Sequence, residues 1–223
     1  MNPLDPGFSI HPDVFAPGSM HALVSALDRA DLIRTRAGAR HVLPVPEVRS
    51  LANQPALLAI AQQYIGSAAL PFRATLFDKS STSNWLVSWH QDTALPIRTQ
   101  FDAIGWGPWS VKGGVVHAIA PASALRQIVV LRVHLDDSTG ENGPLRVLPG
   151  THAEGVLSHE QIEELSNATD AVDCLATAGG VVAMRPLVVH ASSKAQNGRA
   201  RRVLHIEFSA TISFPPGIEL AVG

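Results

Sequence analysis

The sequence predicts a mainly β fold, a sandwich or jelly roll with helices packed against its outside. From about Leu70 onward, short apolar runs rich in β-branched and aromatic residues follow one another, separated by Gly, Pro and Asn. These runs do not alternate with helical patterns, so a parallel sheet built from βαβ units is not expected. Residues 1–70 instead place apolar side chains at helical spacing. We therefore expect one domain over residues 1–223, with a mainly helical part at 1–70 and a jelly-roll core at 71–212.

The N-terminal part contains two helical stretches. In the first, residues 19–38, the hydroxyl of Ser19 is expected to cap the start of the helix. The second, residues 46–66, is expected to form one or two helices and to end at Gly66, because glycine is a common helix stop.

Strand-like runs make up most of the second part. They cover residues 72–78, 84–92, 127–137, 143–150, 179–191 and 201–210. The pair Asn142-Gly143 predicts a tight turn at the start of the fourth run. Residues 159–168 predict a short helix between strands.

Residues 98–125 differ from these runs because they have little periodicity and much Gly and Pro. They are expected to form a long loop, and such loops inside a compact domain are usually functional or disordered. Trp106 and Trp109 argue against disorder. The loop is therefore expected either to cover a site or to anchor itself by packing these two aromatic side chains, with Lys112 either at the site or in solvent.

The composition excludes several classes of function. The chain has 223 residues, 46% of them hydrophobic, and a net charge of -2, so no basic excess points to nucleic acid or to an anionic membrane surface. Cys174 is the only cysteine, which excludes an intrachain disulfide and fits a reducing cytosol. The N-terminal residues lack the pattern of a signal peptide. We expect a soluble cytoplasmic protein, and its oligomeric state is left open.

Three of the runs have one polar and one apolar face, because successive strand residues point to opposite sides. The polar faces hold Ser88, His90 and Asp92; Arg132, His134 and Asp136; and Arg201, His205, Glu207 and Ser209. In the run that contains His90, the opposite face holds Trp85, Val87 and Trp89. Either the sheet has a solvated outside, or a barrel encloses a polar site and buries its apolar face under the N-terminal helices. Solvated strands favour Lys, Thr and Glu, so the His, Arg and Asp residues favour the second interpretation.

A metal site is predicted on the polar face. His90 and Asp92 are one residue apart on one side of a strand, where an imidazole and a carboxylate can reach the same ion; alone, the pair is also typical of a surface hydrogen bond. Two histidines and one carboxylate form the facial triad of non-haem Fe(II) oxygenases. His190, at the end of a later apolar run, can supply the third ligand. Ser192 and Arg201 follow it, and arginine suits a bidentate contact with the carboxylate of a cosubstrate.

These residues and the segments around them resemble the phytanoyl-CoA dioxygenase family of Fe(II)/2-oxoglutarate-dependent oxygenases, especially its short bacterial members. The resemblance runs from about Arg73 to Phe208 and is carried by WHQD, VHLDDSTGENGPLRVLPGTH, AGGVVAMRPLVVHASS and RARRVLHIEF. It implies a double-stranded β-helix, which agrees with the jelly roll predicted from the strands. It also implies residue roles: iron is held by His90, Asp92 and His190, and the distal carboxylate of 2-oxoglutarate is held by Arg201 with Ser192 beside it.

The resemblance also bears on other residues. Thr75 and Thr93 stand where relatives have neighbours of the cosubstrate. Arg132 stands where some relatives have a tryptophan, so it is expected to contact cosubstrate, to contact an acidic substrate, or to form a structural ion pair with Asp136 or Glu207. His152 either lines the mouth of the site or caps it. The remaining histidines considered are expected to be ordinary surface or loop residues: His11, His21, His41, His117 and His159.

The resemblance implies hydroxylation of an unactivated C–H bond in a small molecule, with O2 consumed and succinate and CO2 released. Related halogenases lack the carboxylate ligand, so Asp92 favours hydroxylation over chlorination. Two alternatives stay open: a metal-dependent oxygenase that needs no cosubstrate, and a non-catalytic metal-binding jelly roll. The identity of the substrate is not predicted, because the family acts on acyl thioesters, small polar metabolites and natural products.

Overall fold

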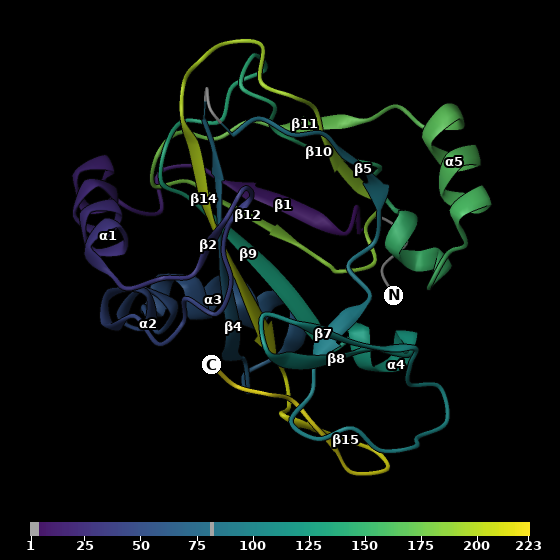
Figure 1. The fold of residues 1–223 in the computed structure, drawn as a ribbon. Coiled ribbons are helices and arrows are strands. Elements are labelled where there is room, and N and C mark those ends of the chain that lie inside the picture. Colours follow the sequence, from purple (N-terminus) through teal and green to yellow (C-terminus); the bar gives the residue numbers. More distant parts are fainter. Residues whose placement is uncertain (1–4, 81–82) are drawn as a thin grey trace.

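Two antiparallel β-sheets face each other and enclose the polar face of the strands (Figure 1). The computed structural model describes residues 5–80 and 83–223; residues 1–4 and 81–82 lie outside the described part. The larger sheet has the strand order β1-β12-β9-β14-β4-β3-β2, and the smaller has the order β11-β10-β13-β5. The larger sheet consists of β1 (Phe8–His11), β2 (Arg34–Thr35), β3 (Gly38–Ala39), β4 (Leu70–Lys79), β9 (Ile128–His134), β12 (Val181–Met184) and β14 (Arg201–Ser209). The smaller consists of β5 (Val87–His90), β10 (Leu145–Val147), β11 (Val172–Cys174) and β13 (His190–Ser192).

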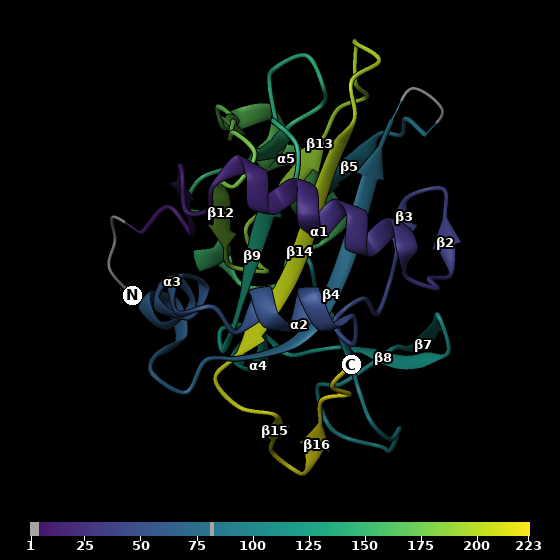
Figure 2. The same ribbon diagram turned by 90° about the vertical axis from the view of Figure 1, so that its left-hand side faces the viewer.

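Three N-terminal helices cover the outer face of the larger sheet (Figure 2). They are α1 (Pro17–Arg29), α2 (Pro46–Ala52) and α3 (Pro55–Ile65). The alternate residues Leu204, Ile206 and Phe208 of β14 are fully buried in one apolar cluster with Leu27 of α1 and Leu57 of α3. This confirms the prediction that the apolar strand face lies under the helices. No helix in the described part of the chain is both long and apolar enough to cross a membrane.

The first helix differs from its predicted bounds at both ends. It begins at Pro17, because the fixed φ of proline suits the first helical position. The Ser19 hydroxyl does not cap it and donates instead to the carbonyl of Ala16. The helix ends at Arg29, and the residues that follow form the short hairpin of β2 and β3 at the edge of the larger sheet.

The later helical predictions agree with the structure. Residues 46–66 form two helices, α2 and α3, and Gly66 ends the second with a φ of 83°. Residues 159–168 form α5 (His159–Ala168), which packs against the outside of the smaller sheet. Ser158 and Gln161 form a capping box at its start.

The region predicted as a long loop, residues 98–125, contains regular structure. It holds β7 (Trp109–Lys112), β8 (Val115–Ile119) and α4 (Ala122–Leu125), and β8 also pairs with β6 (Ala94–Pro96). The β7–β8 hairpin turns at Gly113 and Gly114, both with positive φ. A Gly-Gly pair between two short apolar runs is a hairpin signal, so the sequence carried the information.

The two tryptophans of this region are packed anchors rather than a cover for the site. Trp106 is buried, and its ring lies 5.9 Å from that of Phe214 between centroids. Trp109 packs against the same apolar cluster.

Two further elements complete the fold. The C-terminal residues contain a hairpin of β15 (Ser213–Phe214) and β16 (Ile218–Glu219). A 3-10 turn, Thr151–Glu154, follows β10.

The packing of β14 generates a stability prediction. Leu204 is fully buried at the centre of the larger sheet, so Leu204→Ala leaves a cavity under the helices. We expect it to lower the free energy of unfolding by about 2–5 kcal/mol, measured by urea denaturation. Val111→Ala, at a position 69% exposed on β7, is the control and should change the free energy by less than about 0.5 kcal/mol. Equal effects of the two substitutions would contradict the assigned core.

Candidate metal centre

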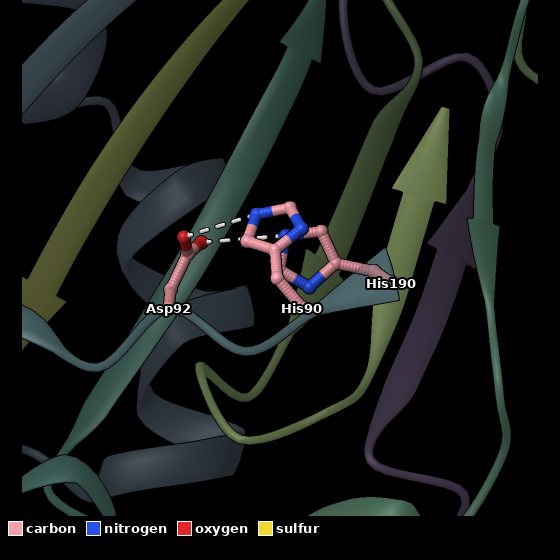
Figure 3. Close-up of side chains that lie close together, drawn as sticks. All are labelled: His90, Asp92 and His190. Atoms are coloured by element: carbon pink, nitrogen blue, oxygen red, sulfur yellow. Dashed lines mark ion pairs between the residues drawn. The ribbon is translucent and has the colours of Figure 1, made fainter. Parts of the chain in front are cut away.

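His90, Asp92 and His190 lie together between the two sheets (Figure 3). His90 ends β5 and His190 begins β13, and the pairing of these strands places the two residues directly opposite each other. Asp92 follows β5, where its backbone N–H donates to the carbonyl of Pro186 at 2.9 Å. One ligand atom from each of the three side chains lies within 4.8 Å of the other two. Residues about a hundred positions apart therefore present two imidazoles and a carboxylate to one point.

Backbone carbonyls orient both imidazoles. Nδ1–H of His90 donates to the carbonyl of Ser88 at 2.8 Å, and that of His190 donates to the carbonyl of Val188 at 2.9 Å. Each Nε2 atom therefore keeps its lone pair, as a metal ligand requires. Nε2 of His90 lies 3.7 Å from Oδ1 of Asp92, and Nε2 of His190 lies 3.6 Å from Oδ2.

The protonation states of the three residues suit a divalent cation. Burial lowers the pKa of His190 to about 4, so this imidazole is neutral at pH 7. Burial alone would raise the pKa of Asp92, but the neighbouring imidazoles of His190, His205 and His90 and the guanidinium of Arg73 hold it well below its usual range. Oδ2 of Asp92 is buried and has no hydrogen-bond partner among the described residues. An ionised carboxylate without a donor, beside two free imidazole nitrogens, fits the two-histidine, one-carboxylate donor set of Fe(II).

A β-bulge in β5 changes which side chains face this centre. His90 lies opposite His190, but Val87 lies opposite Ser192, so β5 has one more residue than β13 between the paired positions. The predicted alternation is therefore wrong before the bulge. Ser88, expected to face inward, is exposed, whereas Trp85 and Val87, expected to face outward, line the cavity.

The outward position of Trp89 agrees with the prediction. Its side chain packs against the buried cluster of Leu148, Ile162 and Val189 under α5. The bulge thus separates two functions of one short strand. Trp89 holds the strand to the outer layer, and His90 points inward.

A cavity of about 170 Å³ extends from the triad between the sheets. Five cationic side chains line it, namely Arg40, Arg73, Lys79, Arg132 and Arg201, together with Thr75, Phe77, Trp85, Val87, Leu145, Ala191, Ser192, His205 and the three residues of the triad. Thr93 is not among the described residues that line it, and its carbonyl accepts a hydrogen bond from the N–H of Ala120.

Arg201 lines the cavity and is only 3% exposed. Its Nη2 atom is 3.4 Å from Oγ of Ser192, but Nε and Nη1 have no partner among the described residues. Burial and the charge of Arg132 lower its pKa to about 9. A buried guanidinium that remains charged at pH 7 with unpaired N–H groups is costly, so its geometry fits an anionic ligand.

Ser192 positions these cations. Its hydroxyl donates to the carbonyl of Gly143 at 2.9 Å and accepts from Nζ of Lys79 at 2.7 Å. Ser192, which the resemblance places beside Arg201, therefore has its hydroxyl hydrogen engaged with the backbone. The buried Lys79 was not predicted. It lies opposite Arg201 in the β4–β14 pairing, and only knowledge of that strand register would have identified it as a residue of the site. Burial, Arg201 and Arg132 lower the pKa of Lys79 to about 7.

Arg132 does not form either of the ion pairs expected for it. Asp136 instead pairs with Arg202 at 2.7 Å, and Glu207 pairs with Arg73. Nη1 of Arg132 instead donates to Nδ1 of His205 at 3.1 Å, so the ring hydrogen of His205 is on Nε2. Arg132 is therefore available to the cavity.

A second buried network, which was not predicted, lies behind the triad. The guanidinium of Arg73 binds the carboxylate of Glu207, and its Nη1 donates to Nε2 of His117 at 3.0 Å. Nε2 of His205 lies 3.6 Å from Oε1 of Glu207 and 4.0 Å from Oδ2 of Asp92. His117 was expected to be an ordinary surface residue, but it is buried because β8 passes beneath this network.

Two other histidines lie away from the metal centre. His152 is buried beside Asp5, 3.7 Å from its carboxylate, and lines a separate cavity with Arg185, so it does not lie at the mouth. His134 is fully buried near Arg132 and Arg201, and neither of its nitrogens has a partner among the described residues. Burial and the two arginines lower the pKa of His134 to about 3.

Comparison with known proteins agrees with this geometry. Residues 6–203 match the family model for phytanoyl-CoA dioxygenase (PhyH). L-proline trans-4-hydroxylase from Streptomyces griseoviridis is 26% identical over 191 residues, which cover 74% of this chain and 63% of that protein. The chain therefore spans less than two thirds of the length of this relative.

Solved structures show the same fold. AviO1 from Streptomyces viridochromogenes Tue57 superposes with a TM-score of 0.66 at 22% identity, covering 96% of this chain and 93% of AviO1. EctD from S. alaskensis, in a structure with 2-oxoglutarate and 5-hydroxyectoine, gives a TM-score of 0.70 at 19% identity over 92% of this chain and 72% of EctD. Another structure of EctD contains bound Fe. The predicted jelly-roll fold with N-terminal helices on its outside is confirmed.

The buried state of His134 predicts a pH-dependent stability. The unfolded chain takes up a proton on this residue below about pH 6.5, whereas the folded chain does not until about pH 3. Stability is therefore lost as the pH falls from about 6.5, by about 1.4 kcal/mol per pH unit for this residue. We expect His134→Leu to reduce the loss of unfolding free energy between pH 7 and pH 5 by about 2 kcal/mol, measured by urea denaturation with a chelator present. The exposed His159→Asn is the control, and an unchanged pH dependence in His134→Leu would contradict the assignment.

Proposed function

The chain belongs to the phytanoyl-CoA dioxygenase family, and on that basis we propose that it is an Fe(II)- and 2-oxoglutarate-dependent dioxygenase that hydroxylates an unactivated C–H bond of a small molecule, releasing succinate and CO2. One observation carries the proposal. The cavity that holds the two-histidine, one-carboxylate triad also holds the buried guanidinium of Arg201, which has two unpaired N–H groups. A metal ligand set and an anion-binding group in the wall of one small cavity are what a chelating dicarboxylate requires.

The ligand residues would hold iron by their own geometry. Nε2 of His90, Nε2 of His190 and a carboxylate oxygen of Asp92 are the donor atoms, and the carbonyl hydrogen bonds of the two histidines keep the donor nitrogens deprotonated. Iron and 2-oxoglutarate, when bound, supply the activation of O2 and the oxidation of the C–H bond. Asp92 contributes negative charge and orientation, because its pKa keeps it ionised at any physiological pH.

Arg201 would hold the distal carboxylate of the cosubstrate. Its 3% exposure excludes water from the contact, which strengthens a charge-assisted hydrogen bond. Lys79 adds a second cation on the same side, and both donate to Ser192, which keeps their side chains in place. We assign Thr75 and Arg132 to the walls of the cavity around the cosubstrate. Thr93 directly follows the ligand Asp92 in the chain, and we assign it a position beside the metal centre.

Arg73, Glu207 and His205 would support this centre from behind. The ion pair between Arg73 and Glu207 fixes the carboxylate that faces Nε2 of His205. His205 in turn lies beside Oδ2 of Asp92, so the N–H on its Nε2 atom is near both carboxylates and favours their ionised form. Outer groups of this kind orient metal ligands and tune their basicity.

The relatives favour a small-molecule substrate. One is an L-proline hydroxylase, and the EctD structure contains 5-hydroxyectoine. We also propose that residues 1–223 work as one domain, because β1 and the N-terminal helices complete the sheet and core that hold the site. A cytoplasmic location fits the single, buried, unpaired Cys174.

A spectroscopic experiment tests the assignment of Arg201. Fe(II) and 2-oxoglutarate added anaerobically to the protein should give a weak charge-transfer band in the visible region. Arg201→Ala removes the cation for the distal carboxylate, so we expect the dissociation constant of 2-oxoglutarate, titrated by this band, to rise by about 100-fold or more. Arg199→Ala, an exposed arginine two residues earlier, is the control and should titrate like wild type. A wild-type protein without the band, or an unchanged affinity in Arg201→Ala, would contradict the proposed function.

Metal binding provides an independent test. His90→Ala removes one of three ligands, and we expect the affinity for Fe(II), measured by anaerobic equilibrium dialysis, to fall at least about 100-fold because the loss of an outer-shell partner alone typically costs about 10–100-fold. His159→Ala, at an exposed helix position, should bind like wild type. Full retention of affinity in His90→Ala would point to a different set of ligands.

A further inference from the structure

Two cations have no role in the proposed reaction: Arg40 in the wall of the cavity, and Lys112 on the neighbouring β7–β8 hairpin. Arg40 follows β3, is exposed, lines the cavity, and makes no hydrogen bond or ion pair with any described residue. Lys112 ends β7 beside the Gly113-Gly114 turn, and its ammonium group likewise has no partner in the described part of the chain. Nε2 of His41 lies 3.5 Å from the carbonyl oxygen of Lys112, which places the Arg40 segment against the tip of the β7–β8 hairpin.

The two side chains act on each other and on the metal site. Burial, then the charges of Arg40 and Arg73, lower the pKa of Lys112, whereas Asp92 raises it. The geometry agrees, because Cδ of Arg40 lies 3.9 Å from the position that a Cβ on Gly113 would take, which places the Arg40 side chain beside the turn that follows Lys112. Since like charges repel, Arg40 and Lys112 raise each other's electrostatic energy. An anion that binds between them lowers that energy.

The charge of the cavity points to that anion. Among the described lining residues, Asp92 is the only carboxylate, whereas five residues are cationic, and the charge of one of these, Arg73, is balanced by Glu207. The whole chain has a net charge of -2, so this positive field is local. If the proposed function is right, the two carboxylates of 2-oxoglutarate and Asp92 offset iron and only part of the charge of Lys79, Arg132 and Arg201. The positive charge of Arg40 and Lys112 then remains unbalanced.

We propose that Arg40 and Lys112 bind the carboxylate of a small, net-anionic substrate at the mouth of the cavity. This inference rests on the proposed function and names its substrate class. Under the proposed function the cavity of about 170 Å³ also holds iron and 2-oxoglutarate, so the space that it leaves favours a small acid. Phe77 and Trp85 supply apolar walls for its body. No carboxylate other than Asp92 is among the described lining residues, so the ammonium group of a zwitterionic amino acid has no partner.

Matched probes test the inference in the complex of the protein with Fe(II) and saturating 2-oxoglutarate, prepared anaerobically so that the Arg201 end is filled. Binding is measured by isothermal titration calorimetry with cyclohexanecarboxylate and cyclohexanecarboxamide, and with N-acetyl-L-proline and L-proline. We expect each net-anionic probe to bind about tenfold more tightly than its neutral or zwitterionic counterpart, the scale of a hydrogen bond to a charged group. Arg40→Gln and Lys112→Gln should each reduce this preference severalfold, and Arg40→Lys should restore most of it.

Controls separate the possible outcomes. Arg49→Gln removes an exposed arginine of α2 outside the cavity and should leave the preference unchanged. The melting temperature of each variant shows whether it is folded, and the conservative Arg40→Lys variant guards against a loss caused by misfolding. Equal binding of the acid and the amide, tighter binding of L-proline than of N-acetyl-L-proline, or a preference that survives both glutamine substitutions would overturn the inference. A wild-type protein that forms no charge-transfer band would instead contradict the proposed function.

Discussion

The antiparallel pairing of β5 with β13 is the constraint on which the site depends. It places His90 opposite His190, and the carbonyls of Ser88 in β5 and of Val188 just before β13 orient the two rings. A register shift of one residue would turn one of these imidazoles to the outer face, because side chains alternate along a strand. The bulge in β5 changes the register of this pairing by one residue between Val87 and His90. It restores an inward direction to His90 while Trp89 stays packed under α5.

The two sheets divide the chemistry of the cavity. The smaller sheet supplies both histidines, whereas the inner face of the larger sheet supplies Lys79, Arg132 and Arg201. The larger sheet can present buried cations because its outer face buries Leu204, Ile206 and Phe208 beneath three helices. That apolar packing supplies the stability against which unpaired buried charges are tolerated. The helices, which do not touch the triad, are thus part of what allows the site to exist.

Much of the fold and the central residues of the site could be predicted from the sequence, for reasons that can be stated. Long strands such as 201–209 carry a clear alternation, and α5 carries both a helical pattern and a capping signal, so their positions follow from local rules. The failures are non-local. The bulge that exposes Ser88 arises from the partner strand, and His117 is buried because the hairpin folds beneath Arg73. The role of Lys79 depends on the β4–β14 register, which no local pattern contains.

The turn at Asn142-Gly143 has a consequence for how this protein tolerates change. Gly143 has a φ of 68°, a Cβ there would come within 2.2 Å of the carbonyl oxygen of Ser193, and its own carbonyl receives the Ser192 hydroxyl. Exposed turns normally accept substitutions and insertions, since little depends on their backbone. This turn instead holds the Ser192 hydroxyl, which in turn accepts from Lys79 and Arg201. In a library of variants we expect this turn to behave like the interior of the protein, because its backbone is buried and holds the Ser192 hydroxyl in place.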